Sequence, residues 1–422
     1  MKIVAFAQNQ YRKFPDDFQD RHEGTVTAPW SLAEPGEIRA AFRDYLDYIM
    51  QAARSGFDGV AFTEHAQTSY DMIANPSVIG GAIAYATETE GLDVAVYPVG
   101  RSLGKAREPV RVAEEYAMID CISGGRLMAG FPVGLMFDAA INNGVPPIEV
   151  RHRYEENLRL ILRAWRDPEP FAWNGRFTQL PSVNIWPRPL QQPLPVWITG
   201  VGNPATMKMA LENNFGFNYF GWFGSELTAG RVFARFREVA DGVGIDANPN
   251  RLAFMASVCV GETDEEAERV YGPHLEYFFN KGPGATQVGK LAIPGGISLP
   301  GIRFLLEDQA GDFGFAHEMR HASAERIFEV GAAVVGSPAT VADRLIGIAR
   351  GYGVGNLVVM LKMGSMPRDL VSDNVARFAE SVLPRLRAET VGDDLPHRWW
   401  PERLGGSPEP AGAKLDALAG AA

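Results

Sequence analysis

The chain has 422 residues, of which 46 % are hydrophobic and 22 % are charged, as is typical of a globular protein with a large core. The formal net charge of −11 argues against nucleic acid and anionic membrane surfaces as partners, because both attract basic proteins. Two cysteines, Cys121 and Cys259, are too few for a disulfide framework and favour a reducing compartment. The N-terminus lacks a signal-peptide core, and no apolar run approaches the ~18 residues of a membrane span, so we expect a cytoplasmic protein.

Short apolar runs alternate with helical patterns along most of the chain. In chain order, we expect strands over 3–7, 58–62, 92–96, 126–130, 195–199, 216–220, 252–260 and 356–361. The clearest helical patterns cover 38–53, 76–89, 109–121, 151–165, 204–214 and 367–386. This succession is typical of an α/β (β/α)₈ barrel, or TIM barrel. A doubly wound open sheet is the competing architecture, and the regular spacing favours the barrel.

Two segments lengthen the barrel, which we assign to residues 1–388. The insertion 167–194, after the fourth strand, is rich in proline and aromatic residues. The insertion 272–336, after the seventh strand, is longer and glycine-rich, which is typical of a lid that covers an active site or of a disordered loop, and we predict a lid. Residues 389–422 are rich in Ala, Gly and Pro and are predicted to form a C-terminal tail or mobile end.

Catalytic groups of such barrels lie where the strands run into the following helices. The second strand is followed there by Glu64 and His65. A neutral imidazole in this place can act as a general base near pH 7, so Glu64 and His65 are our candidate catalytic residues. The alternative is a solvated loop histidine, or one that is bonded to Glu64.

A candidate phosphate site follows the fifth strand. Gly200, Val201 and Gly202 lead to Asn203 and Thr206 at the start of a helix, where free N–H groups and the helix dipole favour an anion. The segment also fits the Rossmann pattern G-x-G-x-x-A, but the next strand ends without the acidic residue that binds a ribose. Arg153, early in the helix after the fourth strand, is a candidate for the same phosphate, or else a surface arginine.

Other residues are candidates on weaker grounds. Asn75, which we expect to cap the helix 76–89, is included among the cofactor-binding residues. The apolar pocket wall is predicted from side chains near strand ends, with barrel packing as the alternative, and comprises Phe6, Tyr97, Phe131, Met136 and Trp222. The run from His317 to His321 matches the zinc pattern H-E-x-x-H, but no third ligand follows at a suitable distance, so we predict no metal site.

Several segments resemble the luciferase-like flavin monooxygenases. They are GFDGVAFTEHAQTSYDMIANP, REPVRVAEEYAMIDCISGGRLMAGFPVG, RYEENLRLILRAW, PLPVWITGVGNPATMKMA and VGSPATVADRLIGIARGYGVGNLVVML, which occur in the order found in that family. The resemblance spans about residues 1–388 and is weakest over 263–330.

The resemblance implies a barrel that binds reduced FMN, activates O₂ as a C4a-peroxyflavin and oxygenates a small organic substrate. It also implies a separate NAD(P)H:flavin reductase and a homodimer formed through the early barrel helices. By position, His65 matches the histidine that assists the oxygen chemistry, and Arg153, Asn203 and Thr206 match phosphate-binding positions.

Two positions depart from the family pattern. Val133 stands where the family often has a phosphate-binding arginine, and Ala66 replaces the second histidine of a Glu-His-His sequence. The alternatives left open are an F420-dependent hydride-transfer enzyme on the same fold and a non-catalytic flavin-binding partner subunit.

Overall fold

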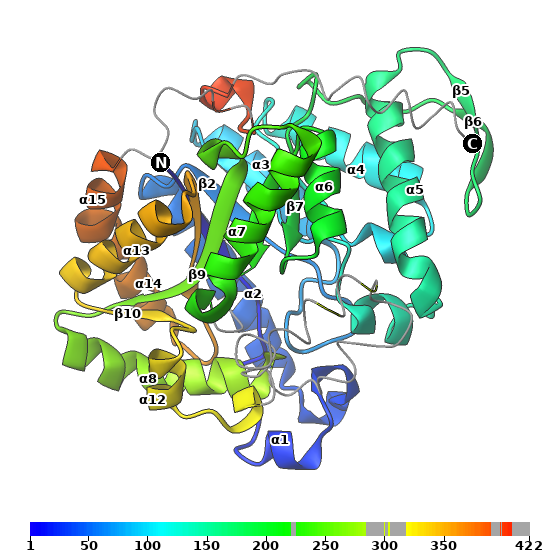
Figure 1. The fold of residues 1–422 in the computed structure, drawn as a ribbon. Helices are drawn as coiled ribbons and strands as arrows, with labels where there is room; N and C mark the ends of the chain where they lie inside the picture. The colour runs from blue at the N-terminus through cyan, green and yellow to red at the C-terminus, as the bar shows by residue number, and fades with distance from the viewer. Residues whose placement is uncertain are drawn as a thin grey trace.

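The computed structural model describes residues 1–220, 225–283, 299, 303, 318–389, 397 and 399–406. Its core is a ring of parallel strands (Figure 1). The barrel strands are β1 (Lys2–Ala7), β2 (Gly59–Phe62), β3 (Ala95–Pro98), β4 (Ala129–Gly130), β7 (Val196–Gly200), β8 (Gly216–Phe220), β9 (Leu252–Val260) and β11 (Asn356–Lys362). Their order is β3-β2-β1-β11-β9-β8-β7-β4, and a bridge from Val96 to Leu127 joins the two ends. The predicted (β/α)₈ barrel is therefore confirmed.

Helices follow the barrel strands, and most of them cover the outside of the ring (Figure 1). The helices are α1 (Phe18–Arg21), α2 (Pro35–Arg54), α3 (Pro76–Thr89), α4 (Pro109–Ile122), α5 (Pro147–Arg166), α6 (Pro204–Glu212), α7 (Ser225–Val243), α8 (Asp264–Lys281), α14 (Arg368–Arg377) and α15 (Leu383–Ala388). Proline at the first turn begins α2 to α6, where its missing N–H and fixed φ are favourable. The predicted helix 367–386 is divided into α14 and α15 by a π-helical turn at Phe378–Val382.

Both insertions occur after the predicted strands. The first forms an antiparallel hairpin of β5 (Phe171–Asn174) and β6 (Gln179–Val183), which projects beside α5 (Figure 1). The second contains α12 (Ala324–Glu329) and β10 (Val334–Gly336), which pairs with β9. Helix α13 (Pro338–Tyr352) follows this insertion and packs against α7 and β9. Helix α8 continues to Lys281, past residue 272, where we expected a lid to begin. About half of the predicted lid, 284–298, 300–302 and 304–317, lies outside the described residues.

The strand register decides which side chains enter the barrel. Phe217 and Tyr219 of β8 contact Phe236 and Phe233 of α7 and therefore face outward, so Asn218 between them faces inward. The parallel pairing carries this alternation around the ring. The inward side chains near the carboxyl ends of the strands are Phe6, Tyr97, Thr199, Asn218, Ser257 and Met360.

The segment 399–406, within the predicted tail, closes the opposite end of the barrel. Trp399 and Trp400 are both buried. The Trp400 indole donates to Asn356 Oδ1 at 2.8 Å, and the Trp197 indole donates to the Trp399 carbonyl at 2.6 Å. Because Asn356 begins β11 and Trp197 lies near the start of β7, the two tryptophans form the floor of the barrel.

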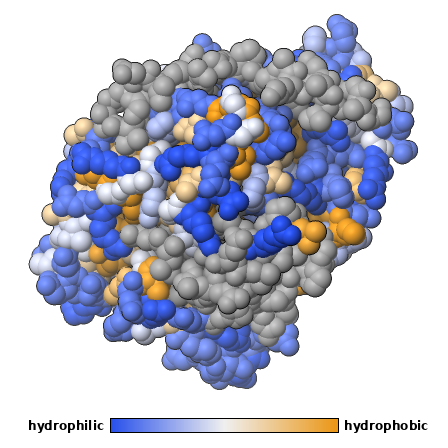
Figure 2. Space-filling view, in the orientation of Figure 1, coloured by the Kyte–Doolittle hydropathy of each residue, from blue (hydrophilic) through white to orange (hydrophobic). Residues whose placement is uncertain are grey.

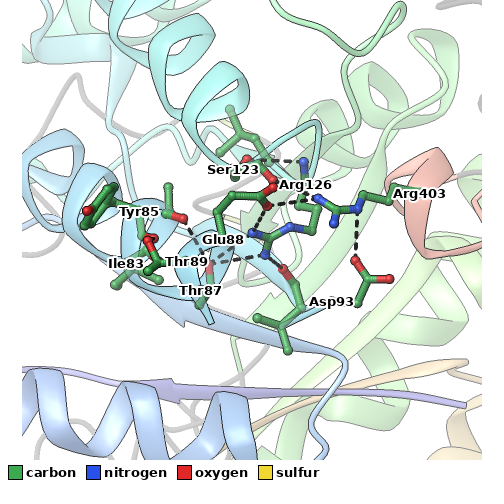
Figure 3. A network of polar contacts seen from close by, with 12 residues as sticks. Ile83, Tyr85, Thr87, Glu88, Thr89, Asp93, Ser123, Arg126 and Arg403 are labelled. Carbon is green, nitrogen blue, oxygen red and sulfur yellow. Dashed lines mark hydrogen bonds and ion pairs between the residues drawn. The ribbon is translucent and has the colours of Figure 1, made fainter. Parts of the chain in front are cut away.

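The buried side chain of Arg126 links the segment 399–406 to the outer part of the barrel (Figure 3). Arg126 is fully buried and donates to the Val94 carbonyl at 2.7 Å and to Glu88 Oε2 at 2.9 Å. Arg403 reaches the same Glu88 oxygen at 3.0 Å and pairs with Asp93 at 3.0 Å. Because Arg126 and Arg403 donate to the same Glu88 oxygen, the C-terminal segment is joined to α3 and to the residues just before β4.

Figure 2 shows one face of the molecule, on which most of the described residues are hydrophilic and the hydrophobic ones form separated spots. None of the helices in the described part of the chain is long and apolar enough to cross a membrane.

Candidate functional site

The candidate site lies at the carboxyl ends of the barrel strands. The loop that follows β1 contacts α8 there, since the backbone N–H of Phe14 donates to the Tyr277 hydroxyl at 2.9 Å. Helices α1, α8 and α12 gather at this end, at the bottom of Figure 1. The two predicted catalytic residues follow β2 at the same end, as expected.

His65 is held by a buried carboxylate. Its Nδ1 lies 2.8 Å from Oδ2 of Asp138, whose side chain is only 2 % exposed. The other oxygen, Oδ1, accepts from the backbone N–H of Ala66 at 3.3 Å. The His65 ring also lies between Tyr70 and Phe137, at centroid distances of 4.8 and 5.9 Å. Nδ1 is thus committed to Asp138, and Nε2 is the nitrogen left for a reacting group.

Glu64 belongs to the same polar cluster, but it contacts cations rather than His65. Its Oε1 lies 3.2 Å from Lys105 Nζ and 3.7 Å from Arg101 NH1. Both cations come from the loop after β3. That loop can approach Glu64 because residue 100 is glycine: a Cβ there would lie 2.1 Å from the Thr63 hydroxyl. Lys105 also lies 3.8 Å from Asp138, so it bridges the two carboxylates.

The surroundings shift two pKa values near His65. Burial alone lowers the pKa of His65, but the charge and hydrogen bond of Asp138 and the charge of Asp71 raise it, and the net shift is upward. Burial raises the pKa of Asp71 to about 6, although His65 and two backbone N–H groups oppose the shift. His65 therefore favours its protonated form more than an ordinary histidine does.

The predicted phosphate loop adopts the expected conformation. Asn203 caps α6, its side chain accepting from the Ala205 N–H at 2.9 Å, and Gly202 has a φ of 116°, which a side chain would disfavour. Arg151 of α5 donates to the Thr206 hydroxyl at 3.1 Å. A guanidinium, a hydroxyl and a helix N-terminus thus meet at one place, which suits an anion.

Arg153 does not reach this loop. Its guanidinium lies 2.8 Å from Glu149 and 4.4 Å from the centroid of the Phe177 ring. Residues two apart on a helix point in nearly opposite directions, so only one of the two arginines can face α6. The structure places Arg151 there in place of Arg153.

The remaining predicted site residues lie in different parts of the structure. Asn75 caps α3, accepting from the Ser77 N–H at 2.8 Å, and Val201 is 43 % exposed beside the phosphate loop. Phe6 and Tyr97 face the barrel interior, which is compatible with a pocket wall. Trp222 lies outside the described residues.

Two predicted pocket residues are placed away from the interior. Phe131 stacks on Tyr116 of α4 and Trp165 of α5, at centroid distances of 5.1 and 5.9 Å, and therefore faces outward. Met136 belongs to a small separate cluster with Ala139, Val145 and Val150. Neither lines the barrel interior.

Several buried polar atoms at this end have no hydrogen-bond partner among the described residues. They belong to the side chains of Gln8, Asn9, Gln10, Glu64, Asp71, Asn218 and Ser257. A buried polar atom without a partner is costly, so such a group is expected to bind a ligand or water. These atoms make the inner end of the barrel suitable for a polar ring system.

The zinc-like pattern does not produce a ligand cluster in the described part of the chain. His317 lies outside it, Met319–His321 form a short 3₁₀ turn, and Glu318 pairs with Arg326 at 2.7 Å. No group of three His, Cys, Asp or Glu residues that could hold a metal is found among the described residues.

Sequence reasoning missed Asp138, Lys105 and Arg151 as site residues. Lys105 follows the third strand, where the barrel rule directs attention, and helical phase distinguishes Arg151 from Arg153. Asp138 gave no such signal, because it lies 73 residues from His65 in sequence.

The chain belongs to the luciferase-like monooxygenase family, whose model matches residues 23–354. A relative of unassigned function from Sinorhizobium fredii is 25 % identical over 71 % of this chain and 86 % of its own length. The FMNH2-dependent dimethylsulfone monooxygenase of Pseudomonas putida is 26 % identical over 54 % of this chain and 61 % of the relative. Three mycobacterial relatives are matched over only 47 % of their length.

Solved structures share the fold. The oxygenating constituent of 3,6-diketocamphane monooxygenase from Pseudomonas putida, solved with FMN, has a TM-score of 0.61 and 20 % identity, covering 82 % of this chain and 93 % of that one. An F420-dependent secondary alcohol dehydrogenase has a TM-score of 0.63 and 16 % identity, covering 92 % and 99 %. The family and its monooxygenase relatives support an oxidoreductase.

Proposed function

We propose that the protein is a monooxygenase that uses reduced FMN and O₂ to oxygenate a small organic substrate. The proposal rests on two features at the same end of the barrel: an anion site at Thr206 and a buried His65 that is bound to a carboxylate. The anion site suits the phosphate of a flavin, and His65 suits oxygen chemistry that consumes protons. The FMNH2-dependent relative is consistent with this choice.

The residues present fit FMN. Arg151, Thr206 and the N-terminus of α6 would hold the phosphate, so that Arg151 supplies the guanidinium that Val133 cannot. The unpartnered Oε1 of Gln8 and the unpartnered side-chain amide of Asn9 offer acceptors and a donor to a polar ring. When bound, reduced FMN supplies the electrons with which O₂ is activated.

The chain's own part is binding, orientation and proton handling. The inward Phe6 and Tyr97 shield the inner end of the barrel from water, because both side chains are almost fully buried. Asp138 orients the His65 ring, which leaves Nε2 to exchange a proton with the reacting oxygen. The ion pair between Glu64 and Lys105 holds both side chains in place beside His65 and Asp138.

The test is a binding and oxygen-uptake experiment. Purified protein is titrated with FMN, reduced FMN and F420, and oxygen uptake is then followed with NAD(P)H and an added flavin reductase. We expect reduced FMN to bind and to support oxygen uptake, which the His65→Gln variant loses. Tight F420 binding without flavin affinity would refute the proposal in favour of hydride transfer. Flavin binding without any turnover would instead indicate a non-catalytic partner subunit.

We also propose a homodimer that works in the cytoplasm with a separate reductase. Helix α3 exposes Val78 and Tyr85, at 69 and 68 %, and α4 exposes Met118 at 51 %. Because α3 and α4 are neighbours, these side chains support a dimer formed through the early barrel helices.

A further inference from the structure

We propose that Asp138 is a positioning residue that keeps His65 protonated on both ring nitrogens, so that His65 acts as a proton donor through Nε2. The identity of the acceptor, a reacting oxygen, rests on the proposed monooxygenase function. The protonation state itself does not, because it follows from the contacts within the protein.

A π-helical turn builds the contact. Asp138 lies in the turn Phe137–Ile141, and π turns occur often at functional sites. Three further hydrogen bonds join this turn to the His65 loop: Asn142 Nδ2 donates to the Ala66 carbonyl at 2.7 Å, Gln67 Nε2 donates to the Asn142 carbonyl at 2.6 Å, and the Ala66 N–H donates to Asp138. The carboxylate is therefore fixed relative to the ring.

The charges of the cluster require a further cation. Glu64, Asp138 and Glu115 are carboxylates, and Arg101 and Lys105 are the cations within 4 Å of them. Three negative charges against two positive charges leave one negative charge among side chains that are at most 20 % exposed. A buried uncompensated charge is costly, and a protonated His65 removes it.

Other groups that face His65 act in both directions. Asp71, which lies in the same loop, favours the protonated ring through its charge, whereas Lys105 opposes protonation. The Tyr70 hydroxyl accepts a hydrogen bond from Gln8 Nε2 at 2.6 Å. With Nδ1–H held by Asp138, release of the Nε2 proton leaves a neutral ring that is still hydrogen-bonded in place.

The expectation drawn from the sequence was a neutral general base. The structure favours the opposite direction of transfer: the proton leaves Nε2 for an anionic oxygen, and solvent later restores it. A group that must donate a proton loses activity as pH rises above its pKa.

The experiment is an NMR titration of His65 in the protein without flavin or substrate. The chain has 7 histidines, so the His65 signal is assigned with His65→Gln. We expect Asp138→Asn to lower the His65 pKa by about 1–3 units, since an opposite charge at this distance has that effect. Lys105→Met should shift the pKa upward. Gln67→Ala, which removes one hydrogen bond between the two loops without a charge change, serves as the control and should shift the His65 pKa far less than Asp138→Asn does.

An unchanged or raised pKa in Asp138→Asn overturns the proposal, and so does a lowered pKa in Lys105→Met. If Asp138→Asn does not fold, Asp138→Glu should retain a raised pKa and Lys105→Met still tests the sign. In enzyme supplied with reduced FMN, Asp138→Asn should move the alkaline limb of the pH profile to lower pH. Absence of oxygen uptake in every form refutes the monooxygenase but leaves the titration result standing.

Discussion

Arg151 and Arg153 provide a matched test of the anion site. Arg151→Met removes a guanidinium that lies 3.1 Å from Thr206 and 3.2 Å from Glu155, and Arg153→Met removes one that is paired with Glu149 and does not reach Thr206. A hydrogen bond to a charged group contributes about 1.5–3 kcal/mol, which corresponds to about 10- to 100-fold in Kd. The Arg151 side chain is 20 % exposed, so solvent screening favours the lower part of this range.

The assay is a fluorescence titration of each variant with FMN and with riboflavin, which lacks the phosphate. Arg151→Met should weaken FMN binding by about tenfold or more and leave riboflavin binding nearly unchanged. Arg153→Met should change the FMN Kd by less than about threefold, because its ion pair and its contact with Phe177 involve no ligand. The reasoning is refuted if Arg153→Met weakens FMN binding more than Arg151→Met does, or if riboflavin is affected equally.

Three further predictions concern stability and assembly. Trp400→Ala should lower the free energy of unfolding by about 3–5 kcal/mol in urea, whereas Trp30→Ala, at a 72 % exposed side chain, should change it little. The pKa of Asp71 is raised to about 6 in the folded protein. Ionisation of this carboxyl therefore lowers the free energy of unfolding as pH rises from about 4 through 6. Asp71→Asn should therefore stabilise the protein at pH 8, by up to about 3 kcal/mol, and much less at pH 4; equal effects at both would contradict this. In light scattering, Tyr85→Glu with Met118→Glu should yield monomers, and an intact dimer would exclude this face.

Local signals predicted the fold well. Helix α3 has the predicted bounds because Asn75 caps it and Pro76 begins it. Strand β3 begins at Ala95 and not at residue 92, because residues after α3 first form a turn at Gly91, whose φ is 65°. The sequence Leu92–Val96 does not show where such a turn ends.

The candidate site was predictable in part. His65 and Thr206 were proposed because each follows a strand of the barrel, and the structure places both at the carboxyl ends of the strands. Phe131 was assigned to the wrong side because β4 is only two residues long and its surroundings are apolar on both faces, so no alternation was readable. Asp138 meets His65 only through the tertiary fold, which one sequence does not reveal.

The aromatic floor has a consequence for biosynthesis. Lys2 lies 5.3 Å from the centroid of the Trp400 ring, so the first strand to be translated meets one of the last described residues. A ribosome adds roughly 5–20 residues per second, so Trp400 is synthesised on the order of tens of seconds after β1. Until the segment 399–406 has been made, the end of the barrel that Trp399 and Trp400 cover remains open. Addition of this segment, rather than formation of the last strand, completes the enclosure.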